Sequence, residues 1–157
     1  MHMQRDYSRY APAKVRAHCS LDDLLSGKVG EGIHAIRYGD GVLDLRLVQR
    51  ESRALIVAFH AAVDPAAATL PVFTGRKVTQ GLDASVLFVS DPSLEHGMSI
   101  GWFAGDSRRP LRKDLVHVIE HVAAQVGAEQ IILEGCSAGG FAALHFPTRS
   151  LDRWRWR

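Results

Sequence analysis

The chain has 157 residues, of which 46% are hydrophobic and 23% charged, and its mean hydropathy is close to zero. This length and composition are typical of one soluble globular domain, which buries about 70% of the surface of its unfolded chain. They exclude a membrane-spanning protein, because no apolar run approaches the roughly 20 residues that cross a bilayer.

The formal net charge of +2 is concentrated at the C-terminus. Residues 149–157 hold four arginines and one aspartate, which leaves 15 basic and 16 acidic groups, a net charge of −1, in residues 1–148. A nearly neutral body offers no broad basic face, so we expect neither a nucleic-acid partner nor a membrane partner.

Two cysteines, Cys19 and Cys136, show no spacing typical of a disulfide framework or a metal site. The first twenty residues are rich in charged side chains and lack the apolar segment of a signal peptide. We therefore expect a cytoplasmic protein without a metal or another cofactor.

The N-terminal segment, residues 1–29, is predicted to be a lead-in that is loosely ordered over residues 1–20 and forms one helical turn at 21–25. Two short strands follow, at 33–38 and 42–48. The Gly39–Asp40–Gly41 sequence between them is a good hairpin turn.

Three continuous apolar runs then predict strands buried on both faces of a parallel sheet. They are residues 54–60, 85–90 and 130–134. Before the third run, a helix begins after Pro110 and ends at Gly127, and its apolar residues form one stripe at 3.6-residue spacing. This order predicts a three-layer, doubly wound α/β fold with a mostly parallel sheet.

The third run leads directly into Gly135–Cys136–Ser137–Ala138–Gly139, a G-x-S-x-G sequence followed by a helix of small residues. In a nucleophile elbow, this pattern places a serine on a sharp turn between strand and helix, so that its hydroxyl projects from the sheet. Gly135 and Gly139 remove the Cβ atoms that would collide across such a turn.

Residues 30–147 thus resemble the first half of an α/β-hydrolase-fold protein. Two further segments, A-F-H-x-x-V-D at 58–64 and G-W-F-x-G at 101–105, are similar to bacterial hydrolase-like proteins of accessory secretion and surface-glycan modification. The resemblance implies acyl transfer by a serine esterase or acyltransferase, with a small acyl or glycan ester as substrate.

The resemblance also implies roles for individual residues. Ser137 would be the nucleophile, and the backbone N–H of Ala138 would bind the oxyanion. The second oxyanion N–H would come from Ala61, in the loop after strand 54–59. His60, beside it, is a candidate base or a member of this oxyanion loop.

In this fold, a complete catalytic triad has its Ser first, its Asp or Glu second and its His third in chain order. After Ser137 the sequence holds one histidine, His145, and one acidic residue, Asp152. We therefore expect a partial domain at 30–146, cut off after the nucleophile helix, in which His60 or His96 is the remaining candidate base. The alternative is a non-catalytic binding or interaction module, or a truncated remnant.

Residues 147–157 form an atypical tail in which arginine and tryptophan alternate. One hypothesis is out-of-frame translation of a GC-rich gene, and the other is a genuine tail that contacts nucleic acid or membrane. The two hypotheses stay open at this point.

Three other features need an explanation. His117 and His121 fall in an H-x-x-E-H sequence, a spacing that is typical of two zinc ligands on one helix face. Both histidines lie away from the apolar stripe of this helix, so we interpret them as a surface pair. Trp102 and Phe103 either line a substrate pocket or cap the core. Asp64, before Pro65, is interpreted as a turn former.

The apolar strand at 130–134 would be an exposed sheet edge if no later strand covered it. Exposed edges recruit other chains, so we expect poor solubility, oligomerisation through this strand or partial disorder.

Overall fold

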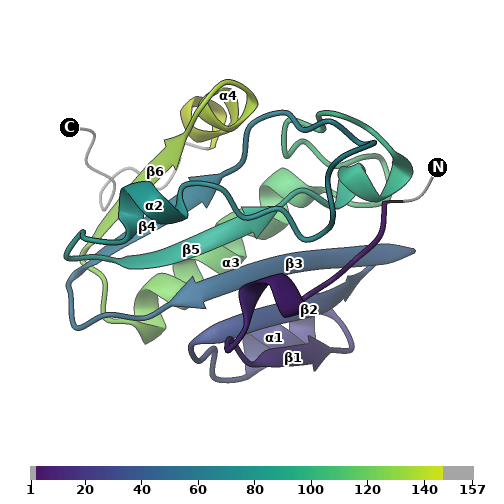
Figure 1. Ribbon diagram of the computed structural model, residues 1–157. Helices are drawn as coiled ribbons and strands as arrows, with labels where there is room; N and C mark the ends of the chain where they lie inside the picture. The colour runs from purple at the N-terminus through teal and green to yellow at the C-terminus, as the bar shows by residue number, and fades with distance from the viewer. Residues whose placement is uncertain (1–2, 147–157) are drawn as a thin grey trace.

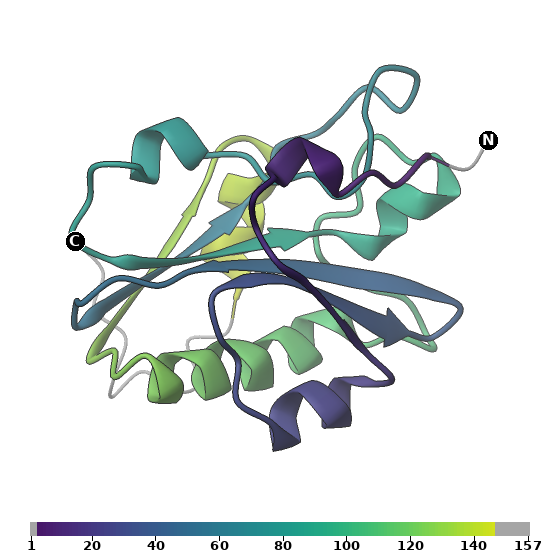
Figure 2. The same ribbon diagram turned by 60° about the horizontal axis from the view of Figure 1, so that its bottom comes forward.

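The structure, a computed structural model, describes residues 3–146 as one six-stranded sheet with helices on both faces (Figures 1 and 2). The strands are β1 (Val15–His18), β2 (Gly32–Tyr38), β3 (Gly41–Val48), β4 (Ala54–Phe59), β5 (Ser85–Ser90) and β6 (Gln130–Gly135). The helices are η1 (Ser8–Tyr10), α1 (Leu21–Ser26), α2 (Arg76–Thr79), η2 (Pro92–His96), α3 (Leu111–Gln125) and α4 (Ala138–His145).

The sheet is mixed, in the order β1-β2-β3-β5-β4-β6. Three of the five neighbouring pairs are parallel, namely β1–β2, β4–β5 and β4–β6, whereas β3 is antiparallel to both of its neighbours. The predicted hairpin joins β2 to β3. The predicted doubly wound α/β fold with a mostly parallel sheet is therefore confirmed.

Successive side chains of β3 point to opposite faces of the sheet. Leu43, Leu45 and Leu47 belong to the larger core, under α1, α3 and α4. Between them, Asp44 and Arg46 point to the opposite face, where η1 and α2 lie (Figure 2). This second face has a smaller apolar cluster around Tyr10 and Phe88, and its covering elements are short.

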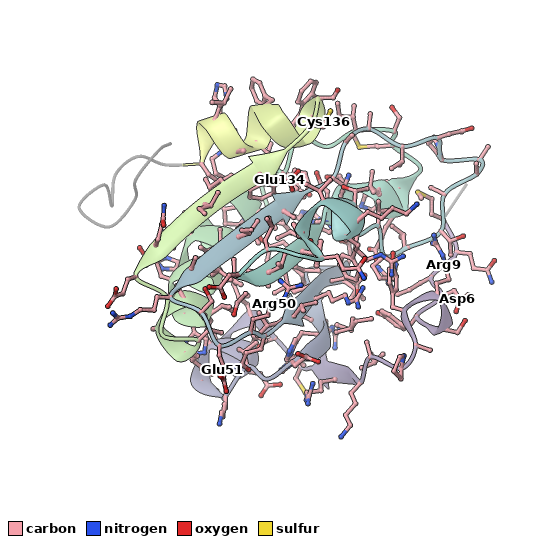
Figure 3. The ribbon with its side chains drawn as sticks, turned by 60° about the vertical axis from the view of Figure 1, so that its left-hand side comes forward. Asp6, Arg9, Arg50, Glu51, Glu134 and Cys136 are labelled. Carbon is pink, nitrogen blue, oxygen red and sulfur yellow. The ribbon has the colours of Figure 1, made fainter. Side chains whose placement is uncertain are left out.

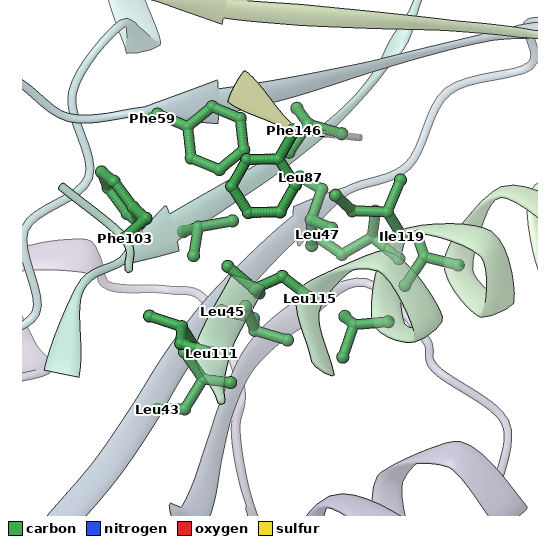
Figure 4. Close-up of a cluster of buried hydrophobic side chains, with 14 of the residues drawn as sticks. Leu43, Leu45, Leu47, Phe59, Leu87, Phe103, Leu111, Leu115, Ile119 and Phe146 are labelled. Atoms are coloured by element: carbon green, nitrogen blue, oxygen red, sulfur yellow. The ribbon is translucent and has the colours of Figure 1, made fainter. Parts of the chain in front are cut away.

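The predicted stripe of the long helix forms the centre of the larger core (Figure 4). Leu111, Leu115 and Ile119 of α3 have no exposed surface, and they pack against the β3 leucines. Burial of one such side chain contributes about 1.5–3 kcal/mol relative to an exposed one. Phe59 and Phe146 stack at the α4 end of the same core, with ring centroids 4.9 Å apart.

The loosely ordered lead-in predicted for residues 1–20 is wrong where the structure describes it. β1 pairs in parallel with β2, from Val15 opposite Ile33 onward, and Arg5 forms an isolated bridge with Leu70. The Tyr7 hydroxyl donates to the buried Asp44 carboxylate at 2.8 Å. A four-residue strand with two charged or polar side chains is too short for hydrophobic periodicity to reveal it.

The helical turn predicted at 21–25 is confirmed as α1, where the Ser20 hydroxyl caps the helix by accepting from the N–H of Asp23 at 3.1 Å. The wider division of the chain at residues 29/30 and 146/147 stays a prediction, and the Arg/Trp tail at 147–157 lies outside the described residues.

Within residues 3–146, β6 is the last strand at its side of the sheet, beyond β4. Its Ile132 side chain is 37% exposed, unlike those of the central strands. No helix in this part of the chain has the length and apolar character needed to cross a bilayer.

Candidate active site

The G-x-S-x-G sequence forms a tight turn between the end of β6 and the start of α4 (Figures 1 and 3). Ser137 sits on it with φ 54° and ψ −116°, a conformation that L-residues rarely adopt. Such a residue costs about 1–3 kcal/mol and persists where the surrounding structure imposes it. Its side chain is exposed, whereas the next residue, Ala138, is buried.

The two glycines of the motif permit close backbone approach. A Cβ on Gly135 would lie 2.3 Å from the carbonyl carbon of Gly139. A Cβ on Gly139 would lie 2.3 Å from the carbonyl oxygen of Phe59 and 2.8 Å from that of His60. The predicted need for glycine at both positions is confirmed, and the loop after β4 is held directly against the first turn of α4.

Ala138 opens α4, where backbone N–H groups have no acceptor within the helix. Ala61 follows His60 in the loop that touches Gly139. The nucleophile role of Ser137 and the oxyanion roles of the Ala138 and Ala61 N–H groups stay predictions.

His60 is buried, and its ring makes two hydrogen bonds that define its tautomer. Nδ1 donates to the carbonyl oxygen of Ala61 at 2.7 Å, and Nε2 accepts from the backbone N–H of Asp91 at 3.0 Å. Burial lowers the pKa of His60, which favours this neutral form. Both ring nitrogens are thus occupied by backbone partners, which argues against His60 as the base, and its roles as base or as member of the oxyanion loop stay predictions.

Asp91, directly after β5, organises the loops around His60. One carboxylate oxygen accepts from the N–H of Phe103 at 2.8 Å, and the other accepts from the N–H and hydroxyl of Ser93. The Phe103 ring packs on Phe59 and His60, with centroids 4.9 and 4.8 Å away. An Asp-Pro pair directly after a buried strand is the signal that could have indicated this role.

Trp102 and Phe103 both adopt positive φ, and their side chains diverge. Phe103 is buried and caps the core, which is one of the two alternatives left open for this pair. Trp102 is 43% exposed and meets Phe141 of α4 edge to face, at 4.9 Å between centroids.

His145 and His96 each contact groups other than Ser137. His145, two turns along α4, stacks on Phe141 and contacts its carbonyl oxygen through Nδ1. His96, the other candidate base, lies 3.1 Å from a guanidinium nitrogen of Arg109. Between residues 3 and 146, no hydrogen bond joins the Ser137 hydroxyl to an imidazole.

The H-x-x-E-H pair on α3 is a surface pair, as interpreted. His117 is exposed, and His121 contacts the carbonyl oxygen of Gly27 and the amide of Gln125. No cluster of three or more histidine, cysteine or acidic side chains suited to a metal ion occurs in the described part of the chain. Asp64 forms the predicted turn, accepting from the N–H of Ala66 at 2.9 Å.

Two other groups flank the turn (Figure 3). Cys136, like Cys19, is an exposed free thiol, and the cytoplasmic location stays a prediction. Glu134 is half-buried beside Gly75, and burial raises the pKa of its carboxyl.

Comparison with known proteins identifies no family. No family model matches the chain, and no curated protein is significantly similar to it. A proline iminopeptidase-related protein from Thermus thermophilus is similar in structure, with a TM-score of 0.45 and 16% identity over 77% of this chain and 41% of its own. The poly(3-hydroxybutyrate) depolymerase LpqC from Bordetella parapertussis has a TM-score of 0.44 and 19% identity over 78% of this chain and 48% of its own. The chain spans less than half the length of either structure.

Proposed function

We propose that this chain carries the nucleophile part of a serine hydrolase-type acyl-transfer site of α/β-hydrolase ancestry, in the class of esterases and acyltransferases. The observation that supports the proposal is Ser137, exposed at φ 54° on the turn from β6 into α4. A surrounding structure that maintains backbone strain at one exposed hydroxyl is typical of a nucleophile elbow.

In the proposed step, the Ser137 oxygen bonds to the acyl carbon of a small acyl or glycan ester, and its proton passes to a base. The backbone N–H groups of Ala138 and Ala61 stabilise the oxyanion. The carbon–oxygen bond to the alcohol then breaks, and the alcohol leaves with the proton. Water or an acceptor hydroxyl releases the acyl group by the reverse sequence.

The base and its acidic partner are not supplied by the arrangement of residues 3–146. His60 is held as a neutral structural imidazole, and His96 and His145 contact other groups. We infer that an active form draws its base from further polypeptide, in this chain or in a second one.

A fluorophosphonate probe read by intact mass tests the proposal. We expect the natural chain to gain one probe adduct, Ser137→Ala to gain none, and Ser107→Ala, which removes another exposed serine, to react like the natural chain. If a chain that unfolds cooperatively gains no adduct, the alternative of a non-catalytic binding or interaction module is favoured.

A further inference from the structure

The face of the sheet under α2 carries a basic groove, which does not involve Ser137. Its volume is about 460 Å³, within the range of small-molecule sites. It is lined by Arg46, Val48, Arg50, Arg76, Lys77, Thr79, Gln80 and Phe88. Four of these residues are cationic, and no acidic side chain is among the described residues that line it.

Arg46 lies on the floor of the groove. It comes from β3, opposite Phe88 of β5, and its guanidinium carbon is 6.0 Å from the Phe88 ring centroid and 5.5 Å from that of Tyr10. Its Nη1 is buried and has no hydrogen-bond partner within residues 3–146. A charged donor shielded from solvent without an acceptor is costly, so the Arg46 guanidinium would gain from a nearby anionic acceptor.

Arg76, at the start of α2, brings a second guanidinium to the same place. Its guanidinium carbon is 5.2 Å from the Tyr10 ring centroid, so Arg46 and Arg76 flank one aromatic ring. Burial, and next the charge of Arg76, lower the pKa of Arg46. An anion near both guanidinium groups would relieve this repulsion between like charges.

Arg50 has a different role at the rim. Its two terminal nitrogens donate to the backbone carbonyl oxygens of Ala84 and Gln80, at 2.5 and 3.4 Å. These neutral acceptors orient the side chain without neutralising its charge. The groove therefore combines one anchored cation, one cation with an unsatisfied nitrogen and two exposed cations on α2.

We propose that this groove binds a small molecule bearing a phosphate group, through Arg46 and Arg76. The planar guanidinium matches phosphate oxygens in pairs, and an arginine-rich site selects such anions over singly charged carboxylates. Residues 1–148 have a net charge of −1 with the four groove cations included, which favours a small ligand over a polynucleotide, since a polynucleotide needs an extended basic surface. The inference does not depend on the function proposed for Ser137.

Isothermal titration of the full chain with inorganic pyrophosphate tests it. We expect binding that weakens as salt is raised, and that weakens at least about tenfold, or roughly 1.4 kcal/mol, in Arg76→Gln and in Arg46→Met. Arg76 is exposed, so its variant keeps the test valid if Arg46→Met fails to fold. Arg53→Gln is the matched control, since Arg53 is an exposed arginine paired with Glu129 elsewhere on the sheet.

Sedimentation with phosphatidylcholine vesicles containing phosphatidic acid distinguishes the source of the phosphate. Vesicle binding displaced by pyrophosphate supports a lipid phosphate, whereas pyrophosphate binding without vesicle binding supports a soluble ligand. The proposal is overturned if pyrophosphate does not bind, if Arg76→Gln and Arg53→Gln bind it equally well, or if the chain binds only a single-stranded oligonucleotide.

Discussion

The imidazole of His60 accepts a 3.0 Å hydrogen bond from the backbone N–H of Asp91, and this bond joins the loops that follow β4 and β5. Because the same ring donates to the Ala61 carbonyl, only the neutral tautomer with its proton on Nδ1 satisfies both partners. His60 therefore maintains the loop that touches the elbow and has no nitrogen left for proton transfer from Ser137.

This tautomer predicts a loss of stability in acid. Burial lowers the pKa of His60, and burial likewise lowers that of His34, each from an ordinary value of 6.5. Both histidines stay neutral in the folded chain while the unfolded chain takes up protons. The stability they contribute is present above pH 6.5 and is lost as the pH falls toward the lower folded values.

Urea titrations between pH 7.5 and pH 5 measure this loss. We expect the free energy of unfolding to fall by up to about 1.4 kcal/mol per pH unit for each histidine, and His60→Gln to show a shallower pH dependence. Gln keeps an oxygen that can accept from the Asp91 N–H, and His117→Gln, on the exposed face of α3, is the control. Parallel pH profiles for the natural chain and His60→Gln would contradict the assignment.

Asp91 provides a second test of the same loops. Asn offers one acceptor oxygen where Asp91 uses two, for Phe103 on one side and Ser93 on the other. We expect Asp91→Asn to lower the free energy of unfolding by about 1–3 kcal/mol, because one buried N–H loses its partner. Amide exchange at Phe103 or Ser93 should accelerate, whereas Asp64→Asn, in an exposed turn, should change stability little. An Asp91→Asn variant with unchanged stability would contradict this role of the Asp91 carboxylate.

The close backbone approach at the elbow predicts that alanine lowers the stability of the fold at Gly139 and not at Gly81. In Gly139→Ala the new Cβ would meet backbone oxygens of Phe59 and His60, so the loop or the helix must shift. We expect a loss of about 1–3 kcal/mol of stability, measured by chemical denaturation. Gly81→Ala is the control, since a Cβ there meets no atom within 4 Å. Equal effects of the two variants would argue against a tight turn.

Glu134 should respond to pH in the opposite sense from the histidines. Burial raises the pKa of its carboxyl, so the stability it contributes at low pH is lost as the pH rises through the folded value. We therefore expect Glu134→Gln to raise the melting temperature at pH 7.5 and to leave it unchanged at pH 3.5. The exposed Glu129→Gln serves as the control. A lower melting temperature for Glu134→Gln at pH 7.5 would show that its charge stabilises the fold.

The elements with strong local signals were predictable from the sequence. Strands β4, β5 and β6 appear as continuous apolar runs, and α3 appears as a 3.6-residue stripe, because burial selects these patterns directly. The glycines of the G-x-S-x-G turn were also predictable, because a side chain at either position would collide with nearby backbone. β1 carried no such signal, since it is a short edge strand whose pairing with β2 depends on residues far along the chain.

The basic groove illustrates a different limit of sequence reasoning. Arg46, Arg50, Arg76 and Lys77 come from two segments that only the sheet and α2 bring together, and an average over residues 1–148 hides them in a net charge of −1. The hydrogen bonds of His60 could not be predicted from the sequence either, because the positions of both backbone partners depend on the conformation of loops. Net charge and residue spacing can be obtained from the sequence alone. The position of a binding site also depends on which face of the sheet each side chain occupies.

The last prediction concerns β6, which lies at the edge of the sheet in the described part of the chain, with Ile132 37% exposed. An apolar edge strand presents unpaired backbone groups to other chains, so we propose that the chain associates through it. Sedimentation velocity over a range of concentrations should show a growing oligomer for the natural chain. Ile132→Lys should shift it toward monomer, since charged side chains oppose edge pairing. Val78→Lys, at a 69% exposed position on α2, controls for added charge alone. If both lysine variants associate like the natural chain, β6 is not the interface, and the exposed aromatic side chains on and beside α4 become the next surface to test.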